Sequence, residues 1–95
     1  MYSDMDNDDK FFLIYSKTDC RFCDLAKQLL LDEGYNYEIK MCDNDLKVDR
    51  EGFLKLMNEK IGYEHKTFPM IFHKNQFVGG YSELVKLLLE LECFN

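Results

Sequence analysis

The chain has 95 residues, of which 46% are hydrophobic, and it carries a formal net charge of −6. This length supports one modest hydrophobic core, so we expect a single domain. Four aspartates lie within residues 1–9, and removing their charges leaves a net charge of −2 for the rest. A body with no basic stripe excludes nucleic-acid binding from the expected functions and disfavours anionic membrane surfaces.

Residues 1–9 are polar, acidic and aperiodic, so we expect a disordered lead-in before a domain over residues 10–95. This lead-in lacks the basic and apolar regions of a secretory signal, and no later stretch approaches the ~18 apolar residues of a membrane span. We therefore expect a soluble cytoplasmic protein. In a reducing cytosol, its four cysteines favour a catalytic or metal-binding pair over structural disulfides.

The first half of the domain predicts a strand, a helix and a second strand. Residues 11–15 form a continuous apolar run, which is typical of a central strand covered on both faces. Apolar residues then recur at helical spacing from Cys20 until Gly34, which supplies a stop. Apolar and polar residues alternate over 35–41, as they do in an edge strand with one wetter face.

The second half predicts a turn-rich loop over residues 42–45 and a helix between Asp49 and Gly62. A short strand over 69–72 begins with proline, and the polar pair 75–76 then turns the chain into a hairpin with strand 77–78. A leucine stripe predicts a last helix from about residue 82 to residue 93. This order of elements predicts an α/β fold with a mixed sheet and helices on both faces.

Cys20 and Cys23 form a C-x-x-C motif directly after a predicted strand and at the start of a predicted helix. Residues three apart share one side of a helix, so their sulfurs can reach bonding distance. The free amides of the first helical turn, together with Arg21 and Lys17, favour a thiolate at Cys20, which we predict to be the nucleophile. Asp19 opposes this charge, although it is also a candidate helix cap.

A C-x-x-C motif is also half of a zinc site, for which Cys42, Cys93, His65 and His73 are candidate partners. None of these four forms a second closely spaced pair, so we predict no metal site. Unpaired cysteines are most often small hydrophobic side chains, and we predict Cys42 and Cys93 to be semi-buried with no assigned role. We expect the two histidines in a loop and at a strand end.

Three segments resemble, in order and spacing, the motifs of the dithiol glutaredoxins. Residues 17–23 resemble their active-site segment, 67–69 their Thr-Val-Pro turn and 78–83 their Gly-Gly segment, and the resemblance extends over residues 10–92. The Gly-Tyr pair at 80–81 is similar to that of the small bacterial-type members. The resemblance implies a thioredoxin-like fold of order βαβαββα, with a four-stranded mixed sheet flanked by helices.

The resemblance also implies glutathione as co-substrate, with Cys20 as the nucleophile and Cys23 as the resolving thiol. A cis peptide bond before Pro69 would let the Phe68 backbone pair with glutathione as an added strand does. Lysines would face its glycine carboxylate, and the start of the last helix its γ-glutamyl end. The implied glutathione-binding residues are Lys17, Phe22, Lys66, Thr67, Phe68, Pro69, Gly80, Tyr81, Ser82 and Glu83.

The implied function is glutathione-dependent reduction of protein–glutathione mixed disulfides and protein disulfides by a monomer. Arg21 and Phe22 stand where the family usually has proline and tyrosine, and Phe68 is larger than the usual middle residue of its turn. A [2Fe-2S] carrier or sensor is the alternative, because a missing proline accompanies cluster binding in some relatives. A thioredoxin proper ranks lower, since no tryptophan precedes the cysteines and the Gly-Gly segment is present.

Overall fold

The computed structural model describes residues 10–93, so the expected lead-in over residues 1–9 lies outside the described residues. The elements follow the predicted order. They are β1 (Phe11–Ser16), α1 (Arg21–Asp32), β2 (Asn36–Met41), α2 (Asp43–Ile61), β3 (Met70–His73), β4 (Gln76–Gly79) and α3 (Tyr81–Cys93). None of the helices within residues 10–93 combines the length and apolar character that a membrane crossing requires.

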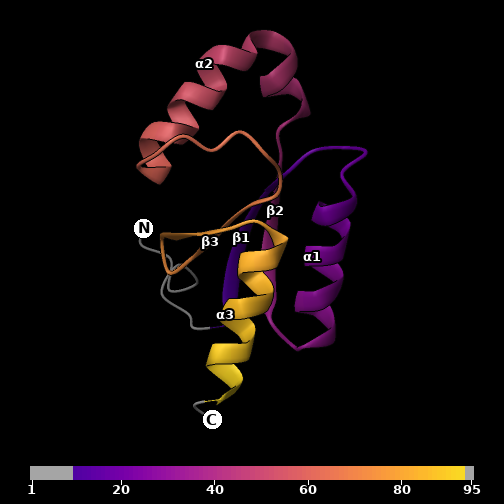
Figure 1. Cartoon of the computed structure of the whole chain (residues 1–95). Coiled ribbons are helices and arrows are strands. Elements are labelled where there is room, and N and C mark those ends of the chain that lie inside the picture. Colours follow the sequence, from indigo (N-terminus) through magenta and orange to yellow (C-terminus); the bar gives the residue numbers. More distant parts are fainter. Residues whose placement is uncertain (1–9, 94–95) are drawn as a thin grey trace, which may run out of the picture.

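The four strands form one mixed sheet in the order β2-β1-β3-β4 (Figure 1). β1 pairs in parallel with β2 and antiparallel with β3, and β3 pairs antiparallel with β4. β1 is central and almost wholly buried, as its apolar run predicts. β2 lies at an edge, where only Tyr37 and Ile39 are partly buried, and this confirms the alternating pattern.

Helices cover both faces of the sheet and divide the core into two clusters. On one face, α1 and α3 lie side by side and pack with Phe12 and Ile14 of β1 (Figure 1). On the other face, α2 packs with Leu13 and Tyr15, the alternate residues of the same strand. The two-residue period of a strand therefore sends the continuous apolar run of β1 into both clusters.

The start of α2 corrects one expectation. The helix begins at Asp43 rather than near Asp49, so the loop predicted over residues 42–45 is mostly helical. Asp43 and Asp45 lie in the first turn, where carboxylates interact favourably with the helix dipole. Asp49 breaks the helical geometry with φ −156° and ψ 83°, which separates a short first segment from the predicted amphipathic one. Gly62 ends the helix with a positive φ of 101°, as predicted.

The hairpin turn is also shifted by one residue from the prediction. Lys74 and Asn75 occupy the turn with φ values of 53° and 64°, whereas Gln76 belongs to β4 and pairs with His73. Two-residue hairpins favour such left-handed turns because their twist matches that of the strands. Lysine rarely adopts a positive φ, so the residue types favoured the polar pair 75–76, one residue later, as the turn.

One edge of the sheet gathers four segments that are distant in sequence. The parallel pair brings Ser16 beside Met41, so β1 and β2 end together. The antiparallel partner of Tyr15 is Met70, so β3 begins at this same edge. Ile71 is in turn paired with Gly79 at the end of β4. Four segments therefore lie together at the end of the sheet where β1 and β2 end: the loop after β1, the start of α2, the turn before β3 and the start of α3.

Two neighbouring leucines of α1 test the core on the sheet face covered by α1 and α3. Leu30 is fully buried in this core, whereas Leu31 is 61% exposed. We expect Leu30→Ala to lower the free energy of unfolding by about 2–5 kcal/mol, because it removes buried apolar contacts and leaves a cavity. Leu31→Ala should change it by less than about 0.5 kcal/mol. Urea denaturation of both variants measures this, and equal losses would contradict the assigned packing.

Candidate active site

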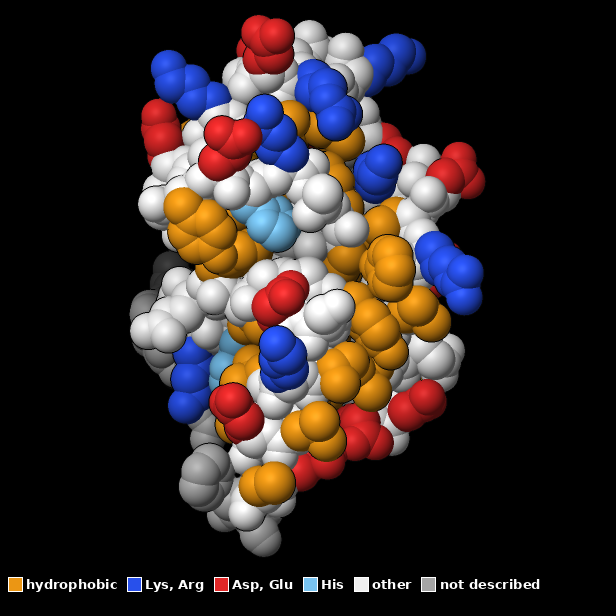
Figure 2. Space-filling model, in the orientation of Figure 1, with side chains coloured by type: hydrophobic (Ala, Val, Ile, Leu, Met, Phe, Trp, Pro, Cys, Tyr) orange, Lys and Arg blue, Asp and Glu red, His pale blue; other side chains and the backbone are white. Residues whose placement is uncertain are grey.

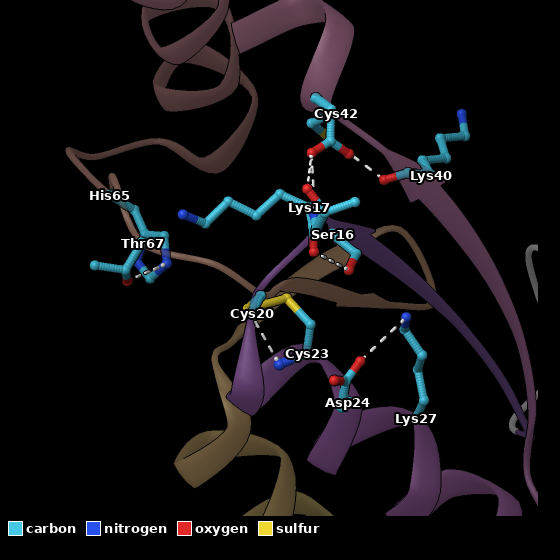
Figure 3. The surroundings of a disulfide bond; sticks show 12 residues. Ser16, Lys17, Cys20, Cys23, Asp24, Lys27, Lys40, Cys42, His65 and Thr67 are labelled. Carbon is cyan, nitrogen blue, oxygen red and sulfur yellow. Dashed lines mark hydrogen bonds and ion pairs between the residues drawn. A yellow bond between two sulfur atoms is a disulfide. The ribbon is translucent and has the colours of Figure 1, made fainter.

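A disulfide joins Cys20 and Cys23 at the N-terminus of α1, with their Cα atoms 5.2 Å apart (Figure 3). Cys20 is the N-cap of the helix, and its Sγ accepts a hydrogen bond from the Cys23 amide at 3.2 Å. The two sulfurs differ in access, since Cys20 is 9% exposed and Cys23 is fully buried. An external thiol or disulfide therefore meets Cys20 first.

The helix terminus supplies the electrostatic setting that the sequence predicts. An N-cap sulfur faces amides that lack intrahelical partners, and their partial positive charge stabilises a thiolate. Asp19 is not the cap of this helix, which corrects that interpretation. It adopts a positive φ of 55° and turns the chain into Cys20. Aspartate is among the few residues that tolerate this left-handed conformation, and this accounts for its place in the turn.

Asp43 fixes the loop before the disulfide, a role that sequence reasoning missed. Its Oδ1 accepts hydrogen bonds from the Thr18 amide at 3.0 Å and from Thr18 Oγ1 at 2.6 Å. These two bonds lower the pKa of Asp43 below its ordinary value, and nearby Lys17 adds to the effect. The signal in the sequence is indirect, because it requires the parallel pairing of β1 with β2 to bring position 43 beside position 18.

Two loops bring five of the predicted glutathione-binding residues to one side of the site. Lys17 follows β1, and its side chain extends toward the loop that holds His65 and Thr67 (Figure 3). Thr67 Oγ1 lies 3.3 Å from Nε2 of His65, and Lys66 forms an exposed ion pair with Glu64 at 3.2 Å. The Phe68–Pro69 peptide bond is cis, as the resemblance implies, and Phe68 is partly buried while Pro69 is fully buried.

The remaining predicted residues gather around the start of α3. Gly79 has a φ of 131°, a conformation suited to glycine, and a Cβ added to Gly80 would lie 3.7 Å from the Pro69 carbonyl oxygen. The ring of Tyr81 lies 6.1 Å from that of Phe22, between centroids. These contacts bring the Gly-Gly segment close to both the proline turn and the cysteine segment.

Glu83 has a structural partner within this segment. Its Oε1 accepts a hydrogen bond from the Gly80 amide at 2.8 Å, and the Gly80 carbonyl accepts one from the Leu84 amide at 3.0 Å. This is the reciprocal half of a capping box, in which a glutamate satisfies the amide that precedes its helix. Ser82 and Glu83 are both exposed. The Glu83 carboxylate therefore stabilises the start of α3.

The other two cysteines differ from each other. Cys42 is buried, its thiol donates to the Lys40 carbonyl at 3.5 Å, and burial raises its pKa to about 11. Cys93 is exposed at the end of α3, so its predicted semi-buried position is wrong.

Within residues 10–93, no group of three or more His, Cys, Asp or Glu side chains is placed to hold a metal ion. His65 lies in a loop and His73 ends β3, as predicted.

Comparison with known proteins identifies the family. The glutaredoxin family model matches residues 12–78. The chain belongs to the glutaredoxin family. Human mitochondrial glutaredoxin-2 is 33% identical over 79 residues, which cover 83% of this chain and 46% of that protein. The chain thus corresponds to about half the length of this relative.

Solved glutaredoxin structures share the fold. Glutaredoxin 1 from Francisella tularensis superposes with a TM-score of 0.74 at 25% identity, covering 85% of this chain and 94% of that one. The dithiolic glutaredoxin 2-C-Grx1 from Trypanosoma brucei brucei superposes with a TM-score of 0.68 at 26% identity, covering 95% and 90%. The mixed sheet with its three helices is therefore a thioredoxin-like fold, as predicted.

The Asp43–Thr18 contact predicts a local, pH-dependent effect. Asp43→Ala should speed hydrogen exchange of the Thr18 amide by on the order of tenfold at neutral pH, because the amide loses its acceptor. Asp45→Ala removes a carboxylate from the same helical turn and serves as the control. The pKa of Asp43 is lower in the folded chain than its ordinary value of 3.8. The ionised carboxylate therefore stabilises the loop fully at pH values above 3.8, and this stabilisation is lost as the pH falls below 3.8. Exchange measured by NMR that is equal in both variants would contradict this role.

The two free cysteines should differ in reactivity. In the oxidised protein at pH 8, iodoacetamide should label Cys93 and leave Cys42 unmodified, because only roughly one thiol in a thousand ionises three units below its pKa. Mass spectrometry of native protein identifies the labelled site, and labelling after denaturation provides the control. Rapid labelling of native Cys42 would contradict the buried position of its thiol.

Proposed function

We propose that the chain is a glutathione-dependent thiol-disulfide oxidoreductase that reduces protein–glutathione mixed disulfides and protein disulfides. The observation that carries this proposal is the Cys20–Cys23 disulfide, whose outer sulfur caps α1 and whose inner sulfur is buried. Membership of the glutaredoxin family supports the general activity. The two-cysteine site is also in keeping with the neighbouring structure described as dithiolic.

The first route reduces a protein–glutathione mixed disulfide and begins with an exchange at the glutathione sulfur. The Cys20 thiolate attacks that sulfur in a glutathionylated protein, a Cys20–glutathione disulfide forms, and the protein leaves as a thiolate that takes a proton from water. A second glutathione, reacting as its thiolate, attacks the glutathione sulfur bound to Cys20. Oxidised glutathione leaves and the Cys20 thiolate is restored. In the net reaction, one incoming glutathione reduces the protein sulfur, and the disulfide bond of the substrate is replaced by that of oxidised glutathione.

The second route uses both cysteines. The Cys20 thiolate attacks one sulfur of a protein disulfide and forms a mixed disulfide with it, while the other protein sulfur leaves as a thiolate that takes a proton from water. Cys23 then loses its proton, and its thiolate attacks the Cys20 sulfur. The bound protein sulfur leaves as a thiolate and takes up a proton, and the Cys20–Cys23 disulfide seen in the structure is formed. The helix holds the two sulfurs at bonding distance, so this step is intramolecular and has a high effective concentration. Two glutathiones return the pair to its reduced form.

We propose that glutathione binds in the space bordered by the proline turn, the Gly-Gly segment and the loop after β1. Lys17 and Lys66 would attract its glycine carboxylate, and the Phe68 backbone would pair with its cysteinyl unit. The absence of a side chain at Gly80 allows close approach of the ligand. At the γ-glutamyl end we assign the exposed Ser82 and the amides of the first turn of α3, because the Glu83 carboxylate is engaged by Gly80.

The remaining expectations complete this proposal. We propose that the protein acts as a monomer in a reducing compartment such as the cytosol, on glutathionylated or disulfide-containing proteins.

A [2Fe-2S] carrier is the second candidate because Arg21 replaces the usual proline of the motif. A visible absorption spectrum of anaerobically purified protein separates the two. A colourless protein with glutathione-dependent activity supports the oxidoreductase, and a stable cluster spectrum without this activity would refute it.

The two cysteines should contribute differently to two assays. Cys20→Ser should abolish reduction of a glutathionylated peptide, whereas Cys23→Ser should keep much of it, because glutathione itself can resolve the Cys20 mixed disulfide. Reduction of a protein disulfide should fall at least about tenfold in Cys23→Ser, since the intramolecular thiol is gone. A glutathione-reductase-coupled assay measures both activities. An active Cys20→Ser variant, or a Cys23→Ser variant inactive toward the glutathionylated peptide, would overturn these roles.

A further inference from the structure

An exposed aromatic surface adjoins the disulfide. Phe22 lies between the two cysteines in sequence, is 55% exposed, and has its ring 6.1 Å from that of Tyr81. Hydrophobic side chains gather on the molecular surface over α1 and α3 (Figure 2), the helices to which Phe22 and Tyr81 belong. A large exposed apolar side chain beside a reactive group is typical of a surface that binds another molecule.

Arg21 adds an exposed cation next to Phe22 in the sequence. It is the first residue of α1, directly follows Cys20 and is exposed. Within residues 10–93, no ion pair or hydrogen bond engages its guanidinium group. Its charge is therefore available to a partner that approaches the Cys20 sulfur.

The nearby carboxylates are mostly engaged within the chain itself. Asp24 lies 3.7 Å from Lys27, Glu83 accepts the Gly80 amide, and Asp43 accepts both donors of Thr18. Asp19, on the other side of Cys20, is exposed and forms no ion pair with Arg21. Within residues 10–93, Arg21 is thus a cation without an ion pair on one side of Cys20, and Asp19 is an anion without one on the other side.

We infer that Arg21 determines substrate specificity by binding a carboxylate side chain next to the target cysteine of a client polypeptide, while Phe22 contacts an apolar part of the same segment. This inference rests on the proposed function and names the class of substrate. Arg21 directly follows Cys20, and consecutive Cα atoms lie about 3.8 Å apart, so its side chain is within reach of residues that flank the cysteine of a client bound at Cys20. The planar guanidinium suits a carboxylate because it can donate two parallel hydrogen bonds.

The chemical step itself is unchanged by this contact. The Cys20 thiolate bonds to the glutathione sulfur, the client–glutathione bond breaks, and its electron pair leaves with the client sulfur, which takes a proton from water. The contact with Arg21 acts on the docking of the client before this exchange. An exposed ion pair of this kind should change kcat/KM by about two- to fivefold. The preference should weaken at high ionic strength, where exposed charges are screened.

The test uses two glutathionylated peptides that differ only in the residues flanking cysteine, which are aspartate in one and lysine in the other. With saturating glutathione, the wild type should favour the aspartate peptide by about two- to fivefold in kcat/KM for each charge engaged. Arg21→Gln should remove the preference, Arg21→Glu should reverse it, and Arg21→Lys should retain part of it. The ratio within one enzyme cancels any effect of Arg21 on the Cys20 thiolate.

Arg50→Gln is the matched control, because Arg50 is an exposed arginine of α2 and lies outside the cysteine segment. It should keep the wild-type preference. A preference unchanged in Arg21→Gln, or lost equally in Arg50→Gln, would overturn the inference. Hydroxyethyl disulfide, which carries no flanking charge, distinguishes this failure from that of the proposed function. A wild type active on it but indifferent to peptide charge refutes only the role of Arg21, whereas inactivity on all substrates refutes the proposed function.

Discussion

The site depends on one constraint, which is that the sulfur of Cys20 lies at the N-cap of α1. A helix N-terminus has amides without intrahelical partners, and here Cys20 Sγ accepts one of them, from Cys23. The same three-residue spacing puts the second sulfur within bonding distance of the first. One turn of helix thus provides both an N-terminus that stabilises a thiolate and a second sulfur within bonding distance of it. The difference in burial leaves Cys20 as the more accessible of the two sulfurs.

The rest of the fold holds this helical turn in place. Parallel pairing of β1 with β2 ends both strands at one edge, and Asp43 at the start of α2 can then bind Thr18 in the loop before Cys20. Antiparallel pairing brings the start of β3, and with it the buried Pro69, to the same edge. Segments remote in sequence therefore meet at the disulfide because strand pairing fixes their ends, and each segment contributes few groups of its own.

Features set by local sequence were predictable, and those set by tertiary pairing were not. The C-x-x-C motif, the central strand and the edge strand follow from spacing and periodicity, which need no knowledge of contacts. Asp43 had no such signal, since its partner lies 25 residues away in the sequence. Glu83 shows a related difficulty, because a glutamate three residues after Gly80 fits a capping box as readily as a ligand contact. The predicted hairpin turn was one residue too late because the first turn residue, Lys74, has a positive φ, which is unusual for lysine.

The burial of Cys42 has a consequence for the chemistry of the pair. A chain with four cysteines can form several disulfides, and exchange between them would divert the active thiols. Only a thiolate attacks, so the raised pKa of Cys42, about 11, keeps it protonated at neutral pH even though it follows the strand next to β1. Cys93 is exposed, but it lies at the far end of α3 from the Gly-Gly segment that borders the site. Within one molecule, burial therefore separates Cys42 from the Cys20–Cys23 pair, and the length of α3 separates Cys93 from it.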